Sequence, residues 1–180
     1  MFGKKPAPPK APWAVRLLTP DFVVDGYLDF EEHPESWPFF TPQAAATTTA
    51  TLWLDAPRFT PTSATAGAPP EVSQWLVPFD NSHVAVLPLD EASLAAMRKN
   101  ASSYRFPIAA VVHLGPYVVH GQLLSCYEDV ADLSTLTHNR CLAMQDATIE
   151  RRRPGAPFAG LQAPLVMLNG HWLAGIGLIK

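Results

Sequence analysis

The side chains best suited to chemistry in this chain are its histidines and cysteines, which serve as metal ligands and as acid–base or nucleophilic groups. The histidines are His33, His83, His113, His120, His138 and His171, and the cysteines are Cys126 and Cys141. No histidine belongs to an H-E-x-x-H motif or a close ligand pair with a cysteine, so spacing predicts no metal site. A site assembled only in three dimensions stays open. The cysteines lack the C-x-x-C spacing and are interpreted as reduced thiols, with a disulfide as the alternative.

Motifs of the common enzyme classes are also missing from the sequence. The chain has no G-x-S-x-G, no phosphate-binding loop and no G-x-G-x-x-G. Gly175-Ile176-Gly177 is interpreted as part of a closing strand, and Asp55 and Asp146 as turn-capping residues at strand ends rather than general bases. We therefore expect a protein that is not an enzyme and needs no cofactor.

Charged residues gather in two places that are far apart in the sequence. An acidic segment includes Glu31 and Glu32, and a basic loop holds Arg151, Arg152 and Arg153. The simpler interpretation is two solvated surfaces. The alternative is a head-to-tail contact, in which the basic loop of one subunit meets the acidic segment of the next and builds a ring or a filament.

A second candidate interface is a proline-rich stretch that carries Trp37, Phe39 and Phe40. Aromatic side chains are enriched at protein interfaces. We expect these three rings to be exposed and available to a partner.

The composition favours short strands over long helices. The chain has 180 residues, of which 48% are hydrophobic, 16% are charged and 19 are proline, an abundance that interrupts long helices and central strands. The net charge of −3 lacks the basic surplus usual in nucleic-acid binders. No apolar run is long enough for a membrane span or a signal peptide, so the default location is the cytoplasm.

Two strand-like stretches share one pattern and indicate an internal duplication. Phe22–Leu28 and Tyr117–Leu123 both read aromatic-Val-Val-x-Gly-x-Leu. Glycine weakens a strand unless the strand bends or another backbone approaches closely, so its recurrence predicts a strongly curved strand in each copy. Further along, Asp55-Ala56 aligns with Asp146-Ala147, and Asn169-Gly170 between apolar runs predicts a closing hairpin.

These blocks predict a tandem organisation. We expect a flexible Pro/Lys tail over 1–13, a first unit over 14–89, a linker helix within 90–104 and a second unit over 105–180. Asp90 is suited to cap the helix, and Leu94, Met97 and Ala101 share one face.

The second unit resembles the Sm-like and SH3-like small barrels. Gly121-x-Leu123, Leu142–Ala147 and Leu168-Asn169-Gly170 resemble the short Sm motifs, and Leu133–Leu136 is similar to a turn in a family of small uncharacterised bacterial proteins. The resemblance implies an all-β fold of two tandem, duplicated five-stranded barrels joined by a short helix. It also implies ring assembly and RNA binding. The family's asparagine and arginine fall at Cys141 and Asn169 here, however, which argues against nucleic acid as the partner.

A weaker likeness concerns a small ligand. Arg98 and Arg105 precede Asp132 and Ser134 in an arrangement that resembles the PilZ family of cyclic-dinucleotide-binding barrels.

Taken together, these patterns predict, first, a structural protein that assembles with itself or within a larger complex. An Sm-like nucleic-acid-binding protein and a PilZ-like sensor are the alternatives.

Overall fold

The computed structural model describes residues 10–40, 51–62, 66–69, 71–78, 84–101, 106–125, 141–152 and 160–179, with only the backbone of Pro38 and Phe39. These residues form ten strands, one α-helix and two short 3₁₀ helices. In chain order they are β1 (Trp13–Leu18), β2 (Phe22–Leu28), η1 (Pro34–Phe40), β3 (Thr51–Pro61), β4 (Gln74–Pro78), β5 (Ala85–Pro88), α1 (Glu91–Asn100), β6 (Phe106–Leu114), β7 (Tyr117–Ser125), β8 (Cys141–Arg151), β9 (Leu161–Asn169), η4 (Gly170–Trp172) and β10 (Leu173–Leu178).

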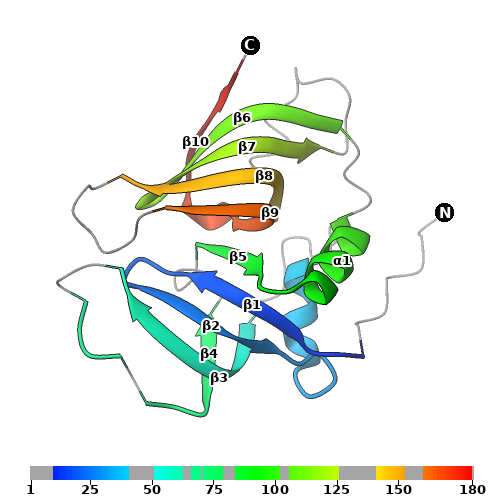
Figure 1. Ribbon diagram of the computed structural model, residues 1–180, viewed down its shortest axis with the longest axis vertical. Coiled ribbons are helices and arrows are strands. Elements are labelled where there is room, and N and C mark those ends of the chain that lie inside the picture. The colour runs from blue at the N-terminus through cyan, green and yellow to red at the C-terminus, as the bar shows by residue number, and fades with distance from the viewer. Residues whose placement is uncertain are drawn as a thin grey trace.

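All ten strands belong to one antiparallel sheet in the order β10-β6-β7-β8-β9-β5-β1-β2-β3-β4. The predicted all-β class is therefore confirmed. The sheet is open, however, and it runs without a break across the boundary predicted between two separate barrels. Figure 1 shows β6–β10 above, β1–β5 below, and β5 meeting β9 between them, with α1 at one side. We call β1–β5 the first half and β6–β10 the second half.

The two halves pair their strands in the same way. Within each half the fifth strand lies beside the first, which is followed by the second, third and fourth, giving β5-β1-β2-β3-β4 and β10-β6-β7-β8-β9. The registers agree as well, since Phe22 pairs with Pro61 at the start of β2 and Tyr117 pairs with Arg151 at the start of β7. A register shift interrupts both ladders near the middle of the second strand.

The shared glycines lie at these two bulges. A Cβ placed on Gly26 would come within 2.8 Å of the Asp55 carbonyl oxygen, and one on Gly121 would come within 2.8 Å of the Gln145 carbonyl oxygen. Real Cβ atoms are essentially never found this close to backbone oxygens, so any other residue at either position would force the backbone to shift. The glycines were predicted to mark strongly curved strands, and the structure shows that they allow two backbones to approach closely at a bulge.

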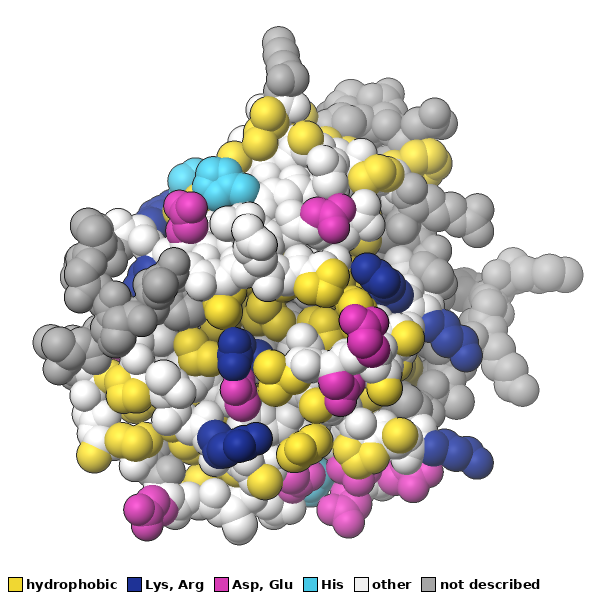
Figure 2. Space-filling view, viewed as in Figure 1, with side chains coloured by type: hydrophobic (Ala, Val, Ile, Leu, Met, Phe, Trp, Pro, Cys, Tyr) yellow, Lys and Arg dark blue, Asp and Glu magenta, His cyan; other side chains and the backbone are white. Residues whose placement is uncertain are grey.

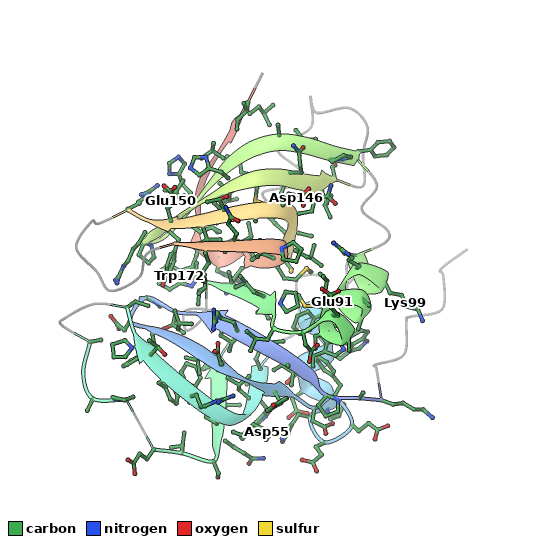
Figure 3. The ribbon with its side chains drawn as sticks, viewed as in Figure 1. Asp55, Glu91, Lys99, Asp146, Glu150 and Trp172 are labelled. Carbon is green, nitrogen blue, oxygen red and sulfur yellow. The ribbon has the colours of Figure 1, made fainter. Side chains whose placement is uncertain are left out.

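The bulges also correct the alignment of the two aspartates. Asp55 faces Tyr27 and Gln145 faces Gln122, which makes Asp55 the counterpart of Gln145. Ala56 and Asp146 are then counterparts, and both have positive φ values, 47° and 50°. Because β3 and β8 continue well beyond these residues, Asp55 and Asp146 lie at mid-strand bulges and not at strand ends (Figure 3).

Two buried clusters form the core, and each draws on both halves. The first cluster is built from β1–β5 and α1 but includes Leu165 and Met167 of β9. The second is built from β6–β9 but includes Val84, just before β5, and Ala85, the first residue of β5. This exchange of side chains across the β5–β9 seam joins the halves into one packed body.

The predicted helix is present as α1, which begins after Asp90. The Asp90 carboxylate accepts a 2.7 Å hydrogen bond from the Ser93 amide, the usual capping arrangement. Leu94, Met97 and Ala101 are buried against the first cluster, as their spacing predicted. The helix therefore covers part of the core and is more than a connector.

The predicted hairpin at Asn169-Gly170 is wrong. The Asn169 side chain accepts a 3.0 Å hydrogen bond from the His171 amide and begins η4, so the chain turns away from β9. Strand β10 then pairs with β6 on the far side of the half. The asparagine stabilises a 3₁₀ turn here, because its side chain can bond the backbone two residues ahead.

Candidate functional site

The seam inside the chain joins the fifth strand of one half to the fourth strand of the other. Ala85 pairs with Leu168 and Val86 pairs with Met167. The Asn169 amide adds a 2.9 Å hydrogen bond to the Val84 carbonyl oxygen. The four paired side chains are at most 3% exposed. The seam is thus a dry and short strand-to-strand contact.

Besides the seam, two side chains of the second half form hydrogen bonds with the backbone of the first half. The Tyr117 hydroxyl donates a 2.7 Å hydrogen bond to the Thr19 carbonyl oxygen, and burial raises the pKa of Tyr117 to about 12. The Arg151 guanidinium donates to the carbonyl oxygens of Pro20, at 2.9 Å, and of Thr62. Arg151 was predicted to contact another subunit, but its guanidinium is bound within its own chain.

The outer strands of the sheet, β4 and β10, each pair with only one other described strand, β3 and β6. They leave one row of backbone donors and acceptors open, the usual template for pairing with another chain. Exposed apolar side chains gather along them. Leu76 on β4 is 44% exposed and Leu178 on β10 is 43% exposed, with Val72 and Ile179 exposed just beyond the strand ends.

The open strands are the counterparts of the strands that form the internal seam. Strand β4 occupies in the first half the place that β9 occupies in the second, and β10 corresponds to β5 in the same sense. In the ladders, Leu76 faces Trp53 as Met167 faces Ala143, and Ile176 faces Val112 as Val86 faces Leu17. The edge strands therefore hold the same positions in their ladders as the two strands that meet inside the chain.

The predicted aromatic interface is mostly internal. Phe40 is 2% exposed, and Trp37 is partly buried against Trp13 and Phe30 in the first core cluster. The expectation of an exposed ring is wrong for Phe40, because the aromatic rings pack edge to face with one another instead of facing solvent. The side chain of Phe39 lies outside the described residues.

The predicted charged interface is only partly described. Glu31 and Glu32 are exposed at the turn after β2, and Figure 2 shows acidic side chains gathered at the lower end of the face in view. Arg152 lies beside the His113 ring, and Arg153 lies outside the described residues. Nothing in the described part of the chain brings the basic loop onto the acidic turn.

Of the four residues predicted to bind a cyclic dinucleotide, only Arg98 lies among the described residues. Arg98 is exposed on α1, whereas Arg105, Asp132 and Ser134 lie outside the described residues.

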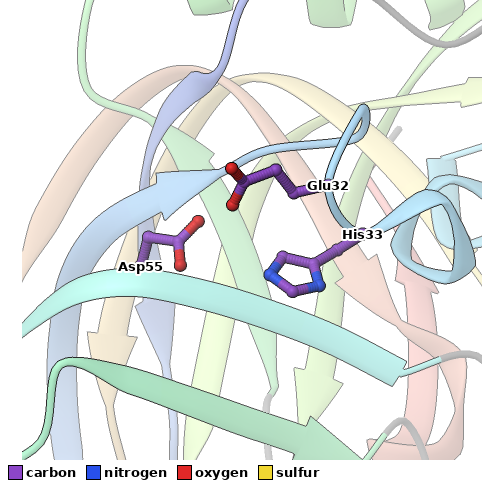
Figure 4. A group of neighbouring side chains, drawn as sticks. All are labelled: Glu32, His33 and Asp55. Atoms are coloured by element: carbon purple, nitrogen blue, oxygen red, sulfur yellow. The ribbon is translucent and has the colours of Figure 1, made fainter.

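A cluster that spacing did not predict lies at the acidic turn. Glu32, His33 and Asp55 each place one potential ligand atom within 4.8 Å of the others (Figure 4). Two of them follow β2 and the third lies on β3 at the bulge, so only the folded sheet brings them together. No short motif could have revealed the set.

None of the helices in the described part of the chain is long and apolar enough to cross a membrane. No family model matches the sequence, and the searches of curated proteins and solved structures returned no significant match.

Proposed function

We propose that this protein is a non-enzymatic assembly component that joins copies of itself edge to edge, with β10 of one chain pairing with β4 of the next. The observation that carries the proposal is the β5–β9 seam, which is this same contact made within one chain. We further infer that the halves are copies of one duplicated five-stranded unit of the small-barrel kind. The shared strand order, bulges and positive φ values support that inference.

The proposed contact between chains takes its register from the internal seam. Replacing each seam residue by its counterpart puts Ile176 opposite Leu76 of the neighbouring chain, and Gly175 opposite its Val77. The exposed side chains of Leu76 and Leu178 would then become buried, as the paired residues of the internal seam already are.

The short length of this contact limits its strength. The contact has only a few backbone hydrogen bonds, each with a net contribution of about 1 kcal/mol to the free energy of association. The apolar side chains add about 25 cal/mol per Å² of surface that they bury. A single contact of this size is weak after the entropic cost of association. Closure of an assembly gives each chain two such contacts, and this raises the overall stability through multivalency.

Cysteine cross-linking tests the register. Directly opposed residues of an antiparallel pair have Cα atoms about 4.5–5.5 Å apart, within the range that a disulfide spans, whereas a diagonal neighbour at about 7–8 Å is too far away. We expect the L76C/I176C double variant to form a covalent ladder under mild oxidation. The L76C/L178C variant serves as the out-of-register control, and the wild-type chain with Cys126 and Cys141 gives the background.

Charge insertion tests the edge itself. We expect Leu76→Lys to shift the particle mass in light scattering to that of a single chain. Leu89 is a matched control, because it is 42% exposed but lies next to β5, away from both outer edges. The proposal fails if the wild-type chain is monomeric at its highest soluble concentration, or if Leu76→Lys and Leu89→Lys change the mass equally.

Ionic strength separates this contact from the charged one. A backbone and apolar contact is not screened by salt, whereas a contact between exposed charges is weakened strongly at high ionic strength. We therefore expect the mass of the assembly to be unchanged in high salt. An assembly that dissolves in salt would instead favour the contact between the basic loop and the acidic turn.

A further inference from the structure

We propose that Glu32, His33 and Asp55 form a binding site for one first-row divalent cation of the Zn²⁺ type. This inference is independent of the edge-to-edge assembly. It starts from the folded turn that holds two of the three residues.

A hydrogen-bonded turn positions Glu32 and His33 beside β3. The Asp29 carboxylate accepts from the amides of Glu31 and Glu32, at 2.9 and 3.2 Å, and the Asp29 carbonyl oxygen accepts from the His33 amide at 2.9 Å. The Trp53 amide in β3 donates a 3.0 Å hydrogen bond to the Ser36 hydroxyl just after the turn. The ligand atoms are thus carried by backbone that is fixed on both sides.

The orientation of His33 is the observation that points to a cation. Its ring stacks on Trp53 with centroids 5.0 Å apart and planes 16° apart, and its Nδ1 lies 3.6 Å from a Glu35 carboxylate oxygen. Its Nε2 is buried and has no hydrogen-bond partner among the described residues. Figure 4 shows the ring facing the carboxylates of Glu32 and Asp55. A buried nitrogen without a partner destabilises the fold, and a bound ion would remove that cost.

The ligand set selects the class of cation. Carboxylates accept hydrogen bonds but do not donate them, so two carboxylates near one imidazole attract a positive charge. Imidazole suits Zn²⁺ and its first-row neighbours, whereas Mg²⁺ and Ca²⁺ prefer oxygen ligands alone. Bonds to Zn²⁺ are about 2.0–2.2 Å long, so ligand atoms within 4.8 Å of one another need only small side-chain rotations to close on the ion.

Two further observations concern Asp55: the hydrogen bond that orients its carboxylate, and the residue at the equivalent position of the second half. Asp55 accepts a 2.8 Å hydrogen bond from the Gln74 side-chain amide, the kind of support that orients a ligating carboxylate. The counterpart of Asp55 in the second half is Gln145, a much poorer ligand. The structure therefore assigns the site to the first half, with one ion per chain.

Calorimetric titration of the full chain with Zn²⁺, after treatment with a chelator, tests the site. We expect one equivalent to bind, with an affinity that falls about tenfold or more in His33→Gln and Asp55→Asn. Glu31→Gln is the matched control, because Glu31 lies in the same turn but outside the cluster, and it should bind as the wild type does. Circular dichroism shows whether each variant is folded.

Three results would overturn the proposal: no saturable Zn²⁺ binding, equal binding by His33→Gln and Glu31→Gln, or equally tight binding of Mg²⁺. Co²⁺ offers a second readout, since its visible absorption should appear on binding to the wild-type chain and be lost in Asp55→Asn.

Discussion

Replacement of Gly121 by alanine probes the bulge that both halves share. The added Cβ would lie 2.8 Å from the Gln145 carbonyl oxygen and 3.1 Å from both the Asp146 carbonyl oxygen and the Ala147 Cα. All three neighbours are backbone atoms of β8, so no side chain can rotate away to make room. The two strands must separate locally, which strains the ladder between β7 and β8.

The cost of this change follows from two opposing effects. Overpacking of a tight site costs about 1–3 kcal/mol, while alanine gains about 0.4–1 kcal/mol over glycine by restricting the unfolded chain. We expect Gly121→Ala to lower the free energy of unfolding by about 1–2 kcal/mol. For a chain of this size each kcal/mol corresponds to about 2–4 °C in the melting temperature.

Urea unfolding followed by circular dichroism measures the effect, and Gly177→Ala is the matched control. Gly177 lies in β10, where the nearest atom to an added Cβ is 3.9 Å away, so this variant should be as stable as the wild type or slightly more. The reasoning is refuted if Gly121→Ala and Gly177→Ala unfold at the same urea concentration. Gly26→Ala should behave as Gly121→Ala does, because its Cβ would meet the Asp55 carbonyl oxygen at 2.8 Å.

Two further predictions concern Tyr117 and Arg151, whose side chains form hydrogen bonds between the two halves. The folded-state pKa of Tyr117, about 12, lies above its ordinary value of 10.0, so the folded chain holds this proton more tightly than the unfolded chain. The resulting stability, at most about 2–3 kcal/mol, is fully present below about pH 10 and is lost as the pH rises towards 12. Alkaline unfolding of Tyr117→Phe should lack this dependence; an unchanged profile would contradict the assignment. Arg151→Ala removes the hydrogen bonds to the Pro20 and Thr62 carbonyl oxygens and should cost about 1.5–3 kcal/mol in urea unfolding, whereas Arg152→Ala should stay within about 0.5 kcal/mol.

Much of the local structure was predictable, because local chemistry determines it. The aromatic-Val-Val-x-Gly-x-Leu pattern placed β2 and the start of β7 correctly, since alternating apolar residues fit a half-buried strand. The repeated glycine was interpreted as a sign of strand curvature, and the structure shows bulges at Gly26 and Gly121 where two backbones approach closely. Asp90 was recognisable as a helix cap because its side chain bonds the helix start directly.

The features that sequence reasoning missed depend on contacts between distant residues. Asn169-Gly170 has the composition of a hairpin turn, but β9 is already paired on both sides, with β5 and β8, so β10 pairs with the open side of β6. The rings of Trp37 and Phe40 were expected at the surface because their stretch is rich in proline, yet Phe40 is buried in the core beside Trp13 and Trp37 is partly buried against it. The cluster of Glu32, His33 and Asp55 could not be predicted from spacing, because its residues come together only when β2 and β3 pair in their observed register.

The internal seam also restricts the number of five-stranded units that any closed particle could contain. Contacts within a chain and contacts between chains would alternate around such a particle, because every chain brings one seam that is already made. The particle would contain twice as many five-stranded units as chains, and never an odd number of units. Its rotational symmetry would follow the number of chains, so neighbouring units would look alike in outline but differ chemically, with a histidine-bearing acidic turn on alternate units only.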